Sequence, residues 1–513
     1  MKSLKFPLFL LCFVFAKGYC QQSAPVVRTE AGLVSGIKDD PGKILTYKGI
    51  PFAAPPVGEL RWKAPQPVKP WNGVRACTAF GPSPMQGKPV PFSMWTAEFL
   101  IAEKPISEDC LYLNIWTPAT GTAEKRPVLV WIYGGGFVSG GASAPIYDGE
   151  AMAKKGILFV SINYRVGIFG FFAHPELSKT SGYGASGNYG LLDQIAALKW
   201  IKKNIAAFGG DPERVTIAGQ SAGSMSVNCL VVSPLARGLF IRAIGESGAS
   251  FTHHQTGLAE AEQRGVKIAQ TAGDGSLGSL MKMPAEELYE KTRNGYGPVV
   301  DGYVLPASIA EIFADGRENK ADLLTGWNQD EGFFSGQPKH AADYRKDATE
   351  KYGSDSILFL SLFPGQTDSI AAQSQMDMSR DLTFGLQNYS WANRQSEQPG
   401  SSVYVYRFIR KPPARGEYVK YGAFHTGEVP YAYNNLRFVD RPWQAVDFRL
   451  ADIMSSYWVN FVATGNPNGP GLPRWPAYTQ SGKQIMLLNE EPHAGPMPDD
   501  KALDFLLSKQ TAQ

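Results

Sequence analysis

The sequence is poor in cysteine and has a single long apolar run near its start. Five cysteines stand among 513 residues. The apolar run Phe6 to Ala16 follows Lys2 and Lys5, and it is too short to cross a bilayer, which is typical of an export signal. We therefore predict a secretory signal peptide over residues 1–20, a secreted or periplasmic protein, and no stable membrane span in the mature chain.

The sequence also lacks a strong net charge. The formal charge is +3, and the signal segment carries three lysines, Lys2, Lys5 and Lys17, and no acidic residue. Removal of that segment therefore brings the charge to about zero. A near-neutral chain has no electrostatic attraction for nucleic acid or anionic membranes, so we expect neither as a partner.

Motifs for metals and nucleotides are missing. No group of His, Cys and Asp has the spacing of metal ligands, and the run Gly134 to Gly136 fits neither G-x-G-x-x-G nor G-x-x-x-x-G-K-[ST]. We predict no metal and no cofactor. Repeats and long polar linkers are missing as well, so residues 21–513 are interpreted as one domain, with lid segments at roughly 250–300 and 340–400.

What is present is a succession of strands and helices. Pro127 to Tyr133 is an almost continuous apolar run, typical of a strand covered on both faces, and Ile157 to Ile162 predicts the next buried strand. Apolar residues at three- and four-residue steps from Leu191 to Phe208 predict a helix that covers the sheet. Asp322 to Thr325 and Val403 to Phe408 predict further strands. We therefore predict an α/β fold with a mostly parallel central sheet flanked by helices, preceded by a small N-terminal β-meander.

The most informative stretch is a G-x-S-x-G sequence. Val215 to Ala218 predicts a short buried strand, which leads into Gly219 to Gly223 and then into a helix. A sharp turn from strand to helix forces its central residue, Ser221, into strained backbone geometry and exposes the hydroxyl at the end of the strand. The unpaired N–H groups at the start of the helix favour negative charge beside it. Ser221 is the predicted nucleophile.

A serine nucleophile needs a base, and in this kind of fold the order along the chain is nucleophile, acid, histidine. His425 is the best candidate because its loop closely follows the strand that ends at Phe408. The other histidines after Ser221 are interpreted as solvated surface residues; they are His253, His254, His340 and His493.

The acid that orients the histidine has two candidates. Asp330 and Glu331 are adjacent in the loop after the strand at 322–325. Either carboxylate could fix the tautomer of an imidazole. The residues alone do not separate them.

The glycine run predicts an oxyanion hole. It ends the strand beside which the G-x-S-x-G turn should emerge, and glycines let backbone N–H groups approach a substrate oxygen. We expect these N–H groups to act together with that of Ala222.

These blocks resemble the type-B carboxylesterase and cholinesterase-like family of α/β hydrolases. Phe208 to Gly223 looks like the nucleophile signature of that family, and Glu108 to Asn114 is similar to its second signature. Asn163 to Gly167 and Asn188 to Gln194 are similar to further family blocks. The similarity runs from about Val27 to Trp475-Pro476, which is nearly the whole chain.

The resemblance implies an α/β-hydrolase fold with helical lid insertions, and it implies roles for individual residues. The nucleophile, acid and base would be Ser221, Glu331 and His425, and the oxyanion donors would be Gly135, Gly136 and Ala222. The implied ion pairs are Arg61 with Glu108 and Arg165 with Asp193. The resemblance also implies a disulfide between Cys77 and Cys110, which export favours too, and Cys229 is interpreted as a buried free thiol.

The sequence departs from the family at one position beside the nucleophile. Many members carry an acidic residue there, whereas this chain has Gln220. The missing negative charge argues against a cationic substrate such as a choline ester. Trp95 lies between Cys77 and Cys110, and its sequence position is compatible either with lining the pocket or with ordinary packing.

We predict hydrolysis of a small-molecule carboxylic ester through a Ser-His-Glu triad and an acyl-enzyme. The same triad would permit amide, lactone or acyl-transfer chemistry. A non-catalytic binding protein of this family is the alternative of another class, and the presence of all three triad residues argues against it. The sequence specifies neither the acyl or alcohol group of the ester nor the oligomeric state.

Overall fold

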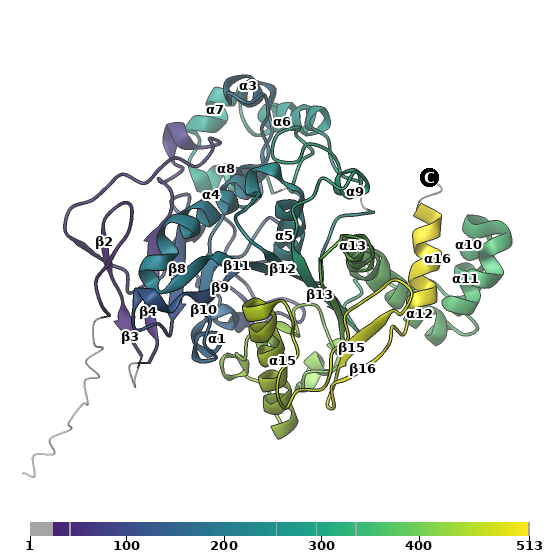
Figure 1. Cartoon of the computed structure of the whole chain (residues 1–513). Coiled ribbons are helices and arrows are strands. Elements are labelled where there is room, and N and C mark those ends of the chain that lie inside the picture. Colours follow the sequence, from purple (N-terminus) through teal and green to yellow (C-terminus); the bar gives the residue numbers. More distant parts are fainter. Residues whose placement is uncertain (1–23, 40–42, 253, 294, 334–335, 511–513) are drawn as a thin grey trace, which may run out of the picture.

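The computed structural model describes residues 24–39, 43–252, 254–293, 295–333 and 336–510 (Figure 1). The predicted signal peptide, residues 1–20, lies outside the described residues, and so does His253. The described part is built around an eleven-stranded sheet.

The order of strands across this sheet differs from their order in the chain. From one edge to the other the strands are β16 (His493–Pro496), β15 (Gln484–Leu488), β14 (Val403–Phe408), β13 (Asp322–Asn328), β12 (Arg242–Glu246), β11 (Gly210–Gln220), β9 (Arg126–Ile132), β10 (Leu158–Ile162), β8 (Tyr112–Thr117), β4 (Leu45–Pro51) and β3 (Ile37–Lys38). Neighbours from β15 to β10 run parallel, and the pairs outside them run antiparallel. The sheet is therefore mixed and mostly parallel at its centre, as predicted.

The predicted central strands form where the apolar runs lie. β9, β10 and β14 correspond to the predicted strands, and β13 extends the predicted one to Asn328. Val128 to Ile132 are fully buried, because helices cover both faces of a parallel sheet and leave no polar side for the strand to present.

Helices cover the two faces of the sheet (Figure 1). One face carries α4 (Tyr189–Asn204), α5 (Ala222–Val232) and α13 (Leu386–Ser396), and the other carries α1 (Glu150–Lys154) and α15 (Ala445–Thr464). The remaining α-helices are α2 (Gly167–Phe171), α3 (Pro175–Thr180), α6 (Leu258–Ala272), α7 (Leu277–Lys282), α8 (Ala285–Lys291), α9 (Ile309–Ala314), α10 (Ala341–Tyr352), α11 (Ser356–Leu362), α12 (Asp368–Arg380), α14 (Val429–Ala432) and α16 (Asp500–Gln510). A π-helical turn, η8 (Asp381–Gly385), joins α12 to α13.

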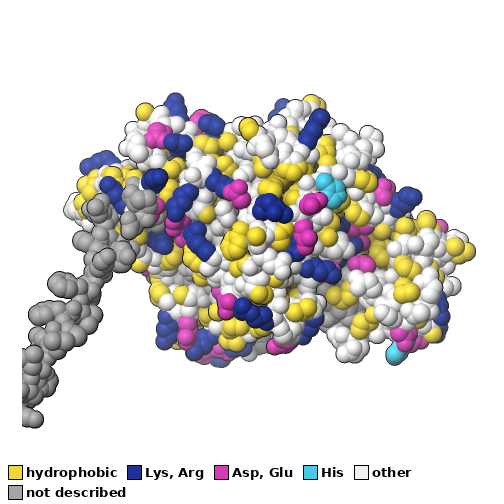
Figure 2. Space-filling view, turned by 90° about the horizontal axis from the view of Figure 1, so that it is seen from below, with side chains coloured by type: hydrophobic (Ala, Val, Ile, Leu, Met, Phe, Trp, Pro, Cys, Tyr) yellow, Lys and Arg dark blue, Asp and Glu magenta, His cyan; other side chains and the backbone are white. Residues whose placement is uncertain are grey.

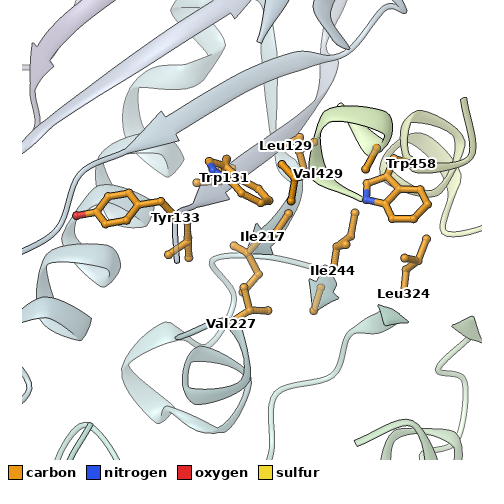
Figure 3. Close-up of a cluster of buried hydrophobic side chains, with 14 of the residues drawn as sticks. Leu129, Trp131, Tyr133, Ile217, Val227, Ile244, Leu324, Val429 and Trp458 are labelled. Carbon is orange, nitrogen blue, oxygen red and sulfur yellow. The ribbon is translucent and has the colours of Figure 1, made fainter. Parts of the chain in front are cut away.

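The core lies between the sheet and these helices. Figure 3 shows Ile217 of β11, Ile244 of β12 and Leu324 of β13 among the buried side chains, with Val227 of α5 and Trp458 of α15 packed around them. All five side chains are fully buried. The strand ends that carry the loops described below therefore rest on a rigid base.

The N-terminal strands do not form one separate meander. β1 (Val27–Arg28), β2 (Leu33–Ser35) and β5 (Val74–Ala76) make a small three-stranded sheet, whereas β3 and β4 pair along β8 and extend the large sheet. The predicted meander is thus split, because the alternating strand β4 finds a free antiparallel edge on β8. A two-stranded ladder, β6 (Ser83–Pro84) with β7 (Ile106–Ser107), lies in the loop between them.

The predicted disulfide is not formed. Cys77, Cys110 and Cys229 are free, buried thiols. Cys77 follows β5, where its carbonyl accepts from the N–H of Lys48, while Cys110 lies in the surroundings of the Arg165 and Asp193 side chains. The two thiols have different neighbours, and burial raises the pKa of each, so both stay protonated.

The two ion pairs implied by the resemblance are present. Arg61 Nε donates to Glu108 Oε2 over 2.8 Å, and Arg165 donates two hydrogen bonds of 2.8 Å to the carboxylate of Asp193. Arg165 and Asp193 are both buried, so the pair satisfies two charges that would otherwise be costly to bury.

The surface carries mixed charges. On the face shown in Figure 2, basic and acidic side chains alternate without a large patch of one sign, which agrees with the low net charge of the sequence. Among the described residues, no helix combines the length and the apolar character that a bilayer crossing requires.

Candidate active site

Ser221 occupies a strained turn between β11 and α5. Its backbone has φ 58° and ψ −126°, a region that non-glycine residues rarely adopt. The N–H of Ser221 donates to the carbonyl of Glu246 over 2.9 Å, and its carbonyl accepts from Met225 of α5. The predicted turn is therefore present, and hydrogen bonds to the next strand and to the helix hold it.

Close backbone contacts require glycine at both ends of the G-x-S-x-G stretch. A Cβ atom on Gly219 would lie 2.4 Å from the backbone of Gly223, and one on Gly223 would lie 2.1 Å from the carbonyl oxygen of Ile132. Both distances are below any real carbon contact. The turn can close against β9 only because both side chains are missing.

His425 and Glu331 form a buried pair. His425 Nδ1 lies 2.8 Å from Glu331 Oε2, and the residues are 4% and 0% exposed. The second carboxylate oxygen of Glu331 accepts from the N–H of Asn328 over 2.7 Å. The carboxylate is thus held on both sides, and it fixes Nδ1 as the protonated nitrogen of the imidazole.

Asp330, which the sequence could not separate from Glu331, has a different position. Its Oδ2 accepts from the N–H of Ala423 over 2.8 Å, two residues before His425. Asp330 therefore holds the loop that carries the histidine, whereas Glu331 contacts the ring.

Gln220 also reaches the imidazole. Its side-chain nitrogen lies 3.2 Å from His425 Nε2 and 3.4 Å from Nδ1. Since Nδ1 is committed to Glu331, the amide donates to Nε2. Among the described residues no hydrogen bond joins the Ser221 hydroxyl to this nitrogen, and in enzymes without substrate such contacts are often long.

The glycine run after β9 lies against the turn. A Cβ atom on Gly134 would lie 3.0 Å from Cβ of Ser221, and Gly135 and Gly136 have φ of 113° and 62°. Within the described ranges, the backbone N–H groups of Gly135, Gly136 and Ala222 donate to no protein acceptor. These three groups are the predicted oxyanion donors, and they are available to a ligand.

Gln86 fixes the loop that follows the glycine run. Its side-chain nitrogen donates to the carbonyl of Gly140 over 2.7 Å, and its side-chain oxygen accepts from the Gly140 N–H over 2.8 Å. The side chain is buried. Gln86 therefore takes the place of a backbone partner for this loop. No sequence motif predicted this role.

Ser221, His425 and the glycine run line one cavity of about 530 Å³. Its walls are mainly aromatic and aliphatic; the lining includes Val90, Phe92, Trp95, Phe99, Leu100, Ile101, Tyr147, Tyr289, Phe333 and Phe384. Among the described lining residues there is no Asp or Glu, and Lys88 contributes a positive charge. A cavity of this size and polarity suits a drug-sized, largely apolar molecule.

Aromatic rings enclose the histidine. Phe384 stacks on the ring of His425 with centroids 4.4 Å apart and an angle of 15°. Phe333 and Trp95 meet the same ring edge-on at 5.5 and 6.3 Å. Trp95 lines the cavity, and its Nε1 donates to Thr426 Oγ1 over 3.1 Å. Of the two roles compatible with its sequence position, Trp95 therefore has that of a pocket residue.

Two further buried carboxylates lie behind the pair. Glu246 accepts from Tyr433 Oη over 2.8 Å and from Trp458 Nε1 over 2.9 Å, and Glu428 accepts from the side chain of Asn328. Burial raises the pKa of Glu246 to about 7. Burial, helped by the charges of Glu246 and Glu331, raises the pKa of Glu428 well above its usual value. Both groups therefore hold a proton more tightly than an ordinary carboxyl does.

The remaining predictions concerned the histidines away from the site and the lack of a metal site. His254, His340 and His493 are exposed and pair with Glu260, Asp368 and the carbonyl of Glu491. Within the described ranges, no three His, Cys, Asp or Glu side chains gather in a way that could hold a metal ion.

Comparisons with known proteins find similarity over nearly the whole chain. The profile of the carboxylesterase family matches residues 23–506. The chain is 36% identical to fumonisin B1 esterase from Sphingopyxis macrogoltabida, covering 92% of this chain and 87% of that protein. It is 34% identical to para-nitrobenzyl esterase from Bacillus subtilis (strain 168), covering 91% and 95%.

A solved structure of PNB esterase superposes with a TM-score of 0.78 at 32% identity, covering 94% of this chain and 99% of that one. The large mixed sheet flanked by helices is therefore an α/β-hydrolase fold. The matched profile and the relatives span nearly the whole chain, including the strained serine turn and the histidine loop. The chain belongs to the carboxylesterase family and is a serine carboxylesterase.

Proposed function

We propose that this esterase works through an acyl-enzyme formed on Ser221, with His425 as base and Glu331 as the acid that orients it. The observation that carries the proposal is the buried contact of 2.8 Å between His425 and Glu331, in the wall of the cavity that the strained Ser221 also lines. A nucleophile, a base and a fixed acid are the three parts that acyl transfer needs.

In the first half of the reaction, Ser221 Oγ attacks the ester carbonyl carbon, and its proton passes to His425 Nε2. For this the Gln220 amide must leave Nε2, because one lone pair cannot accept from both groups. The N–H groups of Gly135, Gly136 and Ala222 bind the oxyanion. His425 then protonates the departing alcohol, which leaves the acyl group on Ser221.

In the second half, water attacks the acyl carbonyl while His425 takes one of its protons. The tetrahedral intermediate collapses, the acid product leaves, and the proton returns to Ser221. Glu331 stabilises the imidazolium that forms twice.

We propose neutral esters with an aromatic or branched apolar group as substrates. The cavity has aromatic and aliphatic walls and, among its described lining residues, no carboxylate. A quaternary ammonium group would find no counter-charge there, since Gln220 replaces the acidic residue common in the family. The two relatives described above are named fumonisin B1 esterase and para-nitrobenzyl esterase, and the second name denotes an ester with an aromatic ring.

We also propose that the protein is exported and that residues 1–20 are removed. The support is the lysine-flanked apolar segment of the sequence. N-terminal sequencing of the protein recovered outside the cytoplasm should start close to residue 21. An intact Met1 on the exported protein would contradict this proposal.

The experiment compares wild type with Ser221→Ala on a chain-length series of nitrophenyl esters. We expect the substitution to lower kcat by about four to six orders of magnitude. A second comparison uses acetylcholine and its uncharged isostere, 3,3-dimethylbutyl acetate, for which we expect the higher kcat/KM. Activity that survives in Ser221→Ala would disprove the assigned nucleophile, and preference for the cation would disprove the substrate class.

A further inference from the structure

The connection between α12 and α13 contains an irregular turn next to the active site. The chain continues from α12 through the π-helical turn η8 into α13 without a loop. A π turn holds one more residue than an α turn, so it changes the direction in which the following side chains point. Such turns are uncommon in soluble proteins and are frequent at functional sites.

Phe384, inside this turn, is the residue that lies flat on His425. The ring centroids are 4.4 Å apart, the planes differ by 15°, and Phe384 is only 3% exposed. Phe333 meets both rings edge-on, at 5.9 Å from Phe384 and 5.5 Å from His425. One face of the imidazole is therefore closed by Phe384, while Glu331 binds its edge at Nδ1.

A buried network of charges anchors the turn. Arg380 is 4% exposed, and it donates to Asp377 and Asp381 over 2.8 Å each and to Asp499 over 3.1 Å. It also donates to the carbonyl of Gln329 over 3.2 Å. Arg380 thus ties the π turn to the loop that carries Glu331, so the turn and the acid keep a constant separation.

We propose that Phe384 is a positioning residue for His425 and that the π turn serves to place it. This inference rests on the proposed function, in which His425 is the base. The stacked ring stops the imidazole from rotating about its bond to the chain, so Nδ1 keeps its contact with Glu331 and the ring keeps its place in the wall of the cavity that Ser221 lines. The face of the phenyl ring carries partial negative charge and stabilises the imidazolium formed in both transition states.

The test uses Phe384→Leu and Phe384→Met, which keep an apolar side chain of similar size but lose the ring face, and Phe384→Tyr, which keeps it. Phe359→Leu is the matched control, because Phe359 is 1% exposed and stacks on the ring of Tyr352, and neither residue is among the described residues that line the cavity. Each variant is measured with a nitrophenyl acetate for kcat and KM, and with methanesulfonyl fluoride, whose small size makes little use of the cavity walls. Thermal unfolding monitors folding.

We expect Phe384→Leu and Phe384→Met to lower kcat and the rate of sulfonylation by the same factor, about tenfold, with KM changed less than about twofold. Phe384→Tyr should keep most of both rates. Phe359→Leu should leave kcat, KM and sulfonylation unaltered. A rise in KM with unaltered kcat and sulfonylation in both Phe384→Leu and Phe384→Met would overturn the inference, because Phe384 would then only line the cavity.

Ser221→Ala and His425→Ala are measured beside these variants. If both are inactive and the Phe384 variants behave like wild type, the positioning role fails and the proposed function stands. If either retains the wild-type rate, the proposed function itself fails. If one Phe384 variant does not fold, the other apolar variant decides.

Discussion

The adjacent carboxylates Asp330 and Glu331 have different roles because they contact different groups. Glu331 contacts the ring of His425, whereas Asp330 accepts from the backbone of Ala423. Gly422, which precedes Ala423, has φ 58° and so little space that a Cβ atom would lie 2.2 Å from the Asp330 carboxylate. Asp330 is therefore part of the loop's structure.

The first prediction compares the neutral isosteres of these two acids. Glu331→Gln should lower kcat by about three to four orders of magnitude, because the amide neither fixes the tautomer of His425 nor stabilises its cation. Asp330→Asn keeps an oxygen that can accept from Ala423 and should stay within about threefold of wild type. Steady-state kinetics on one nitrophenyl ester decides, and equal losses in both variants would contradict the assignment.

At the residue scale the sequence predicted the three triad candidates but not their surroundings. Ser221, Glu331 and His425 lie in motifs that the family resemblance identifies. Gln86, Gln220 and Phe384 reach the site from separate segments, and their contacts depend on side-chain geometry that no spacing in the chain encodes. The cavity wall could therefore be described only from the structure.

At the scale of elements, the turn from β11 to α5 depends on the contact between two strands. Gly223 lies so close to Ile132 of β9 that the helix can start there only without a side chain. The same contact brings Ser221 beside the glycine run. The stability of the turn and the geometry of the oxyanion donors are thus coupled.

The second prediction is that Gly223→Ala destabilises the protein by about 3 kcal/mol, since the new methyl group must displace the backbone of β9. Gly278→Ala is the control: Gly278 is exposed in α7, and its Cβ would meet only Ser276 Oγ, at 3.8 Å. It should be neutral or stabilise by roughly 0.5–1 kcal/mol. Urea unfolding measures both, and an unchanged midpoint in Gly223→Ala would refute the contact argument.

The sequence predicted those elements whose pattern is strong and missed those whose pattern is weak. β9 and β14 are apolar runs and were predicted with their bounds nearly correct. β12 has the sequence RAIGE, with a charged residue at each end, and it was not predicted. Its Glu246 can be buried only because the hydroxyl of Tyr433 and the indole of Trp458 lie beside it, and the local sequence does not show these partners. The edge strands β15 and β16 pair with partners that a local pattern does not specify.

At the scale of the whole molecule, the buried acid cluster links folding to pH. Among the described residues, Tyr433 and Trp458 donate to Glu246, and Glu428, Tyr147 and Tyr406 interact with it through charge. The pKa of Glu246 is about 7 in the folded protein, against 4.5 as the ordinary value. Because the folded state holds this proton more tightly, the contribution to stability is full below pH 4.5 and is lost as the pH rises to 7.

The third prediction follows for Glu246→Gln, which keeps an oxygen that can accept from Tyr433 and Trp458 but does not titrate. Between pH 4.5 and 7 the wild type should lose on the order of 3 kcal/mol of unfolding free energy relative to the variant. Titrating groups that do not interact with Glu246 cancel in the difference, which therefore reports the linked titration of Glu246 and Glu428. Urea unfolding of both proteins across this range gives the result; a difference that stays constant with pH would contradict the raised pKa.

The family resemblance also predicted one feature that the whole molecule lacks. A disulfide between Cys77 and Cys110 needs the two thiols to meet, yet Cys77 ends a small outer sheet and Cys110 lies beside the Arg165–Asp193 pair. Both ends of the loop are held by other contacts, namely the hydrogen bond from Lys48 and the ladder of β8. The fold therefore closes this segment without a covalent bond.

Trapping the acyl-enzyme shows whether Ser221 carries the acyl group during turnover. The protein is mixed with a nitrophenyl ester, quenched in acid during turnover, digested and analysed by peptide mass spectrometry. We predict one acyl adduct, on the peptide that contains Ser221, in the wild type, and none in Ser221→Ala or His425→Ala. An adduct on another residue, or turnover at the wild-type rate in Ser221→Ala, would contradict the account.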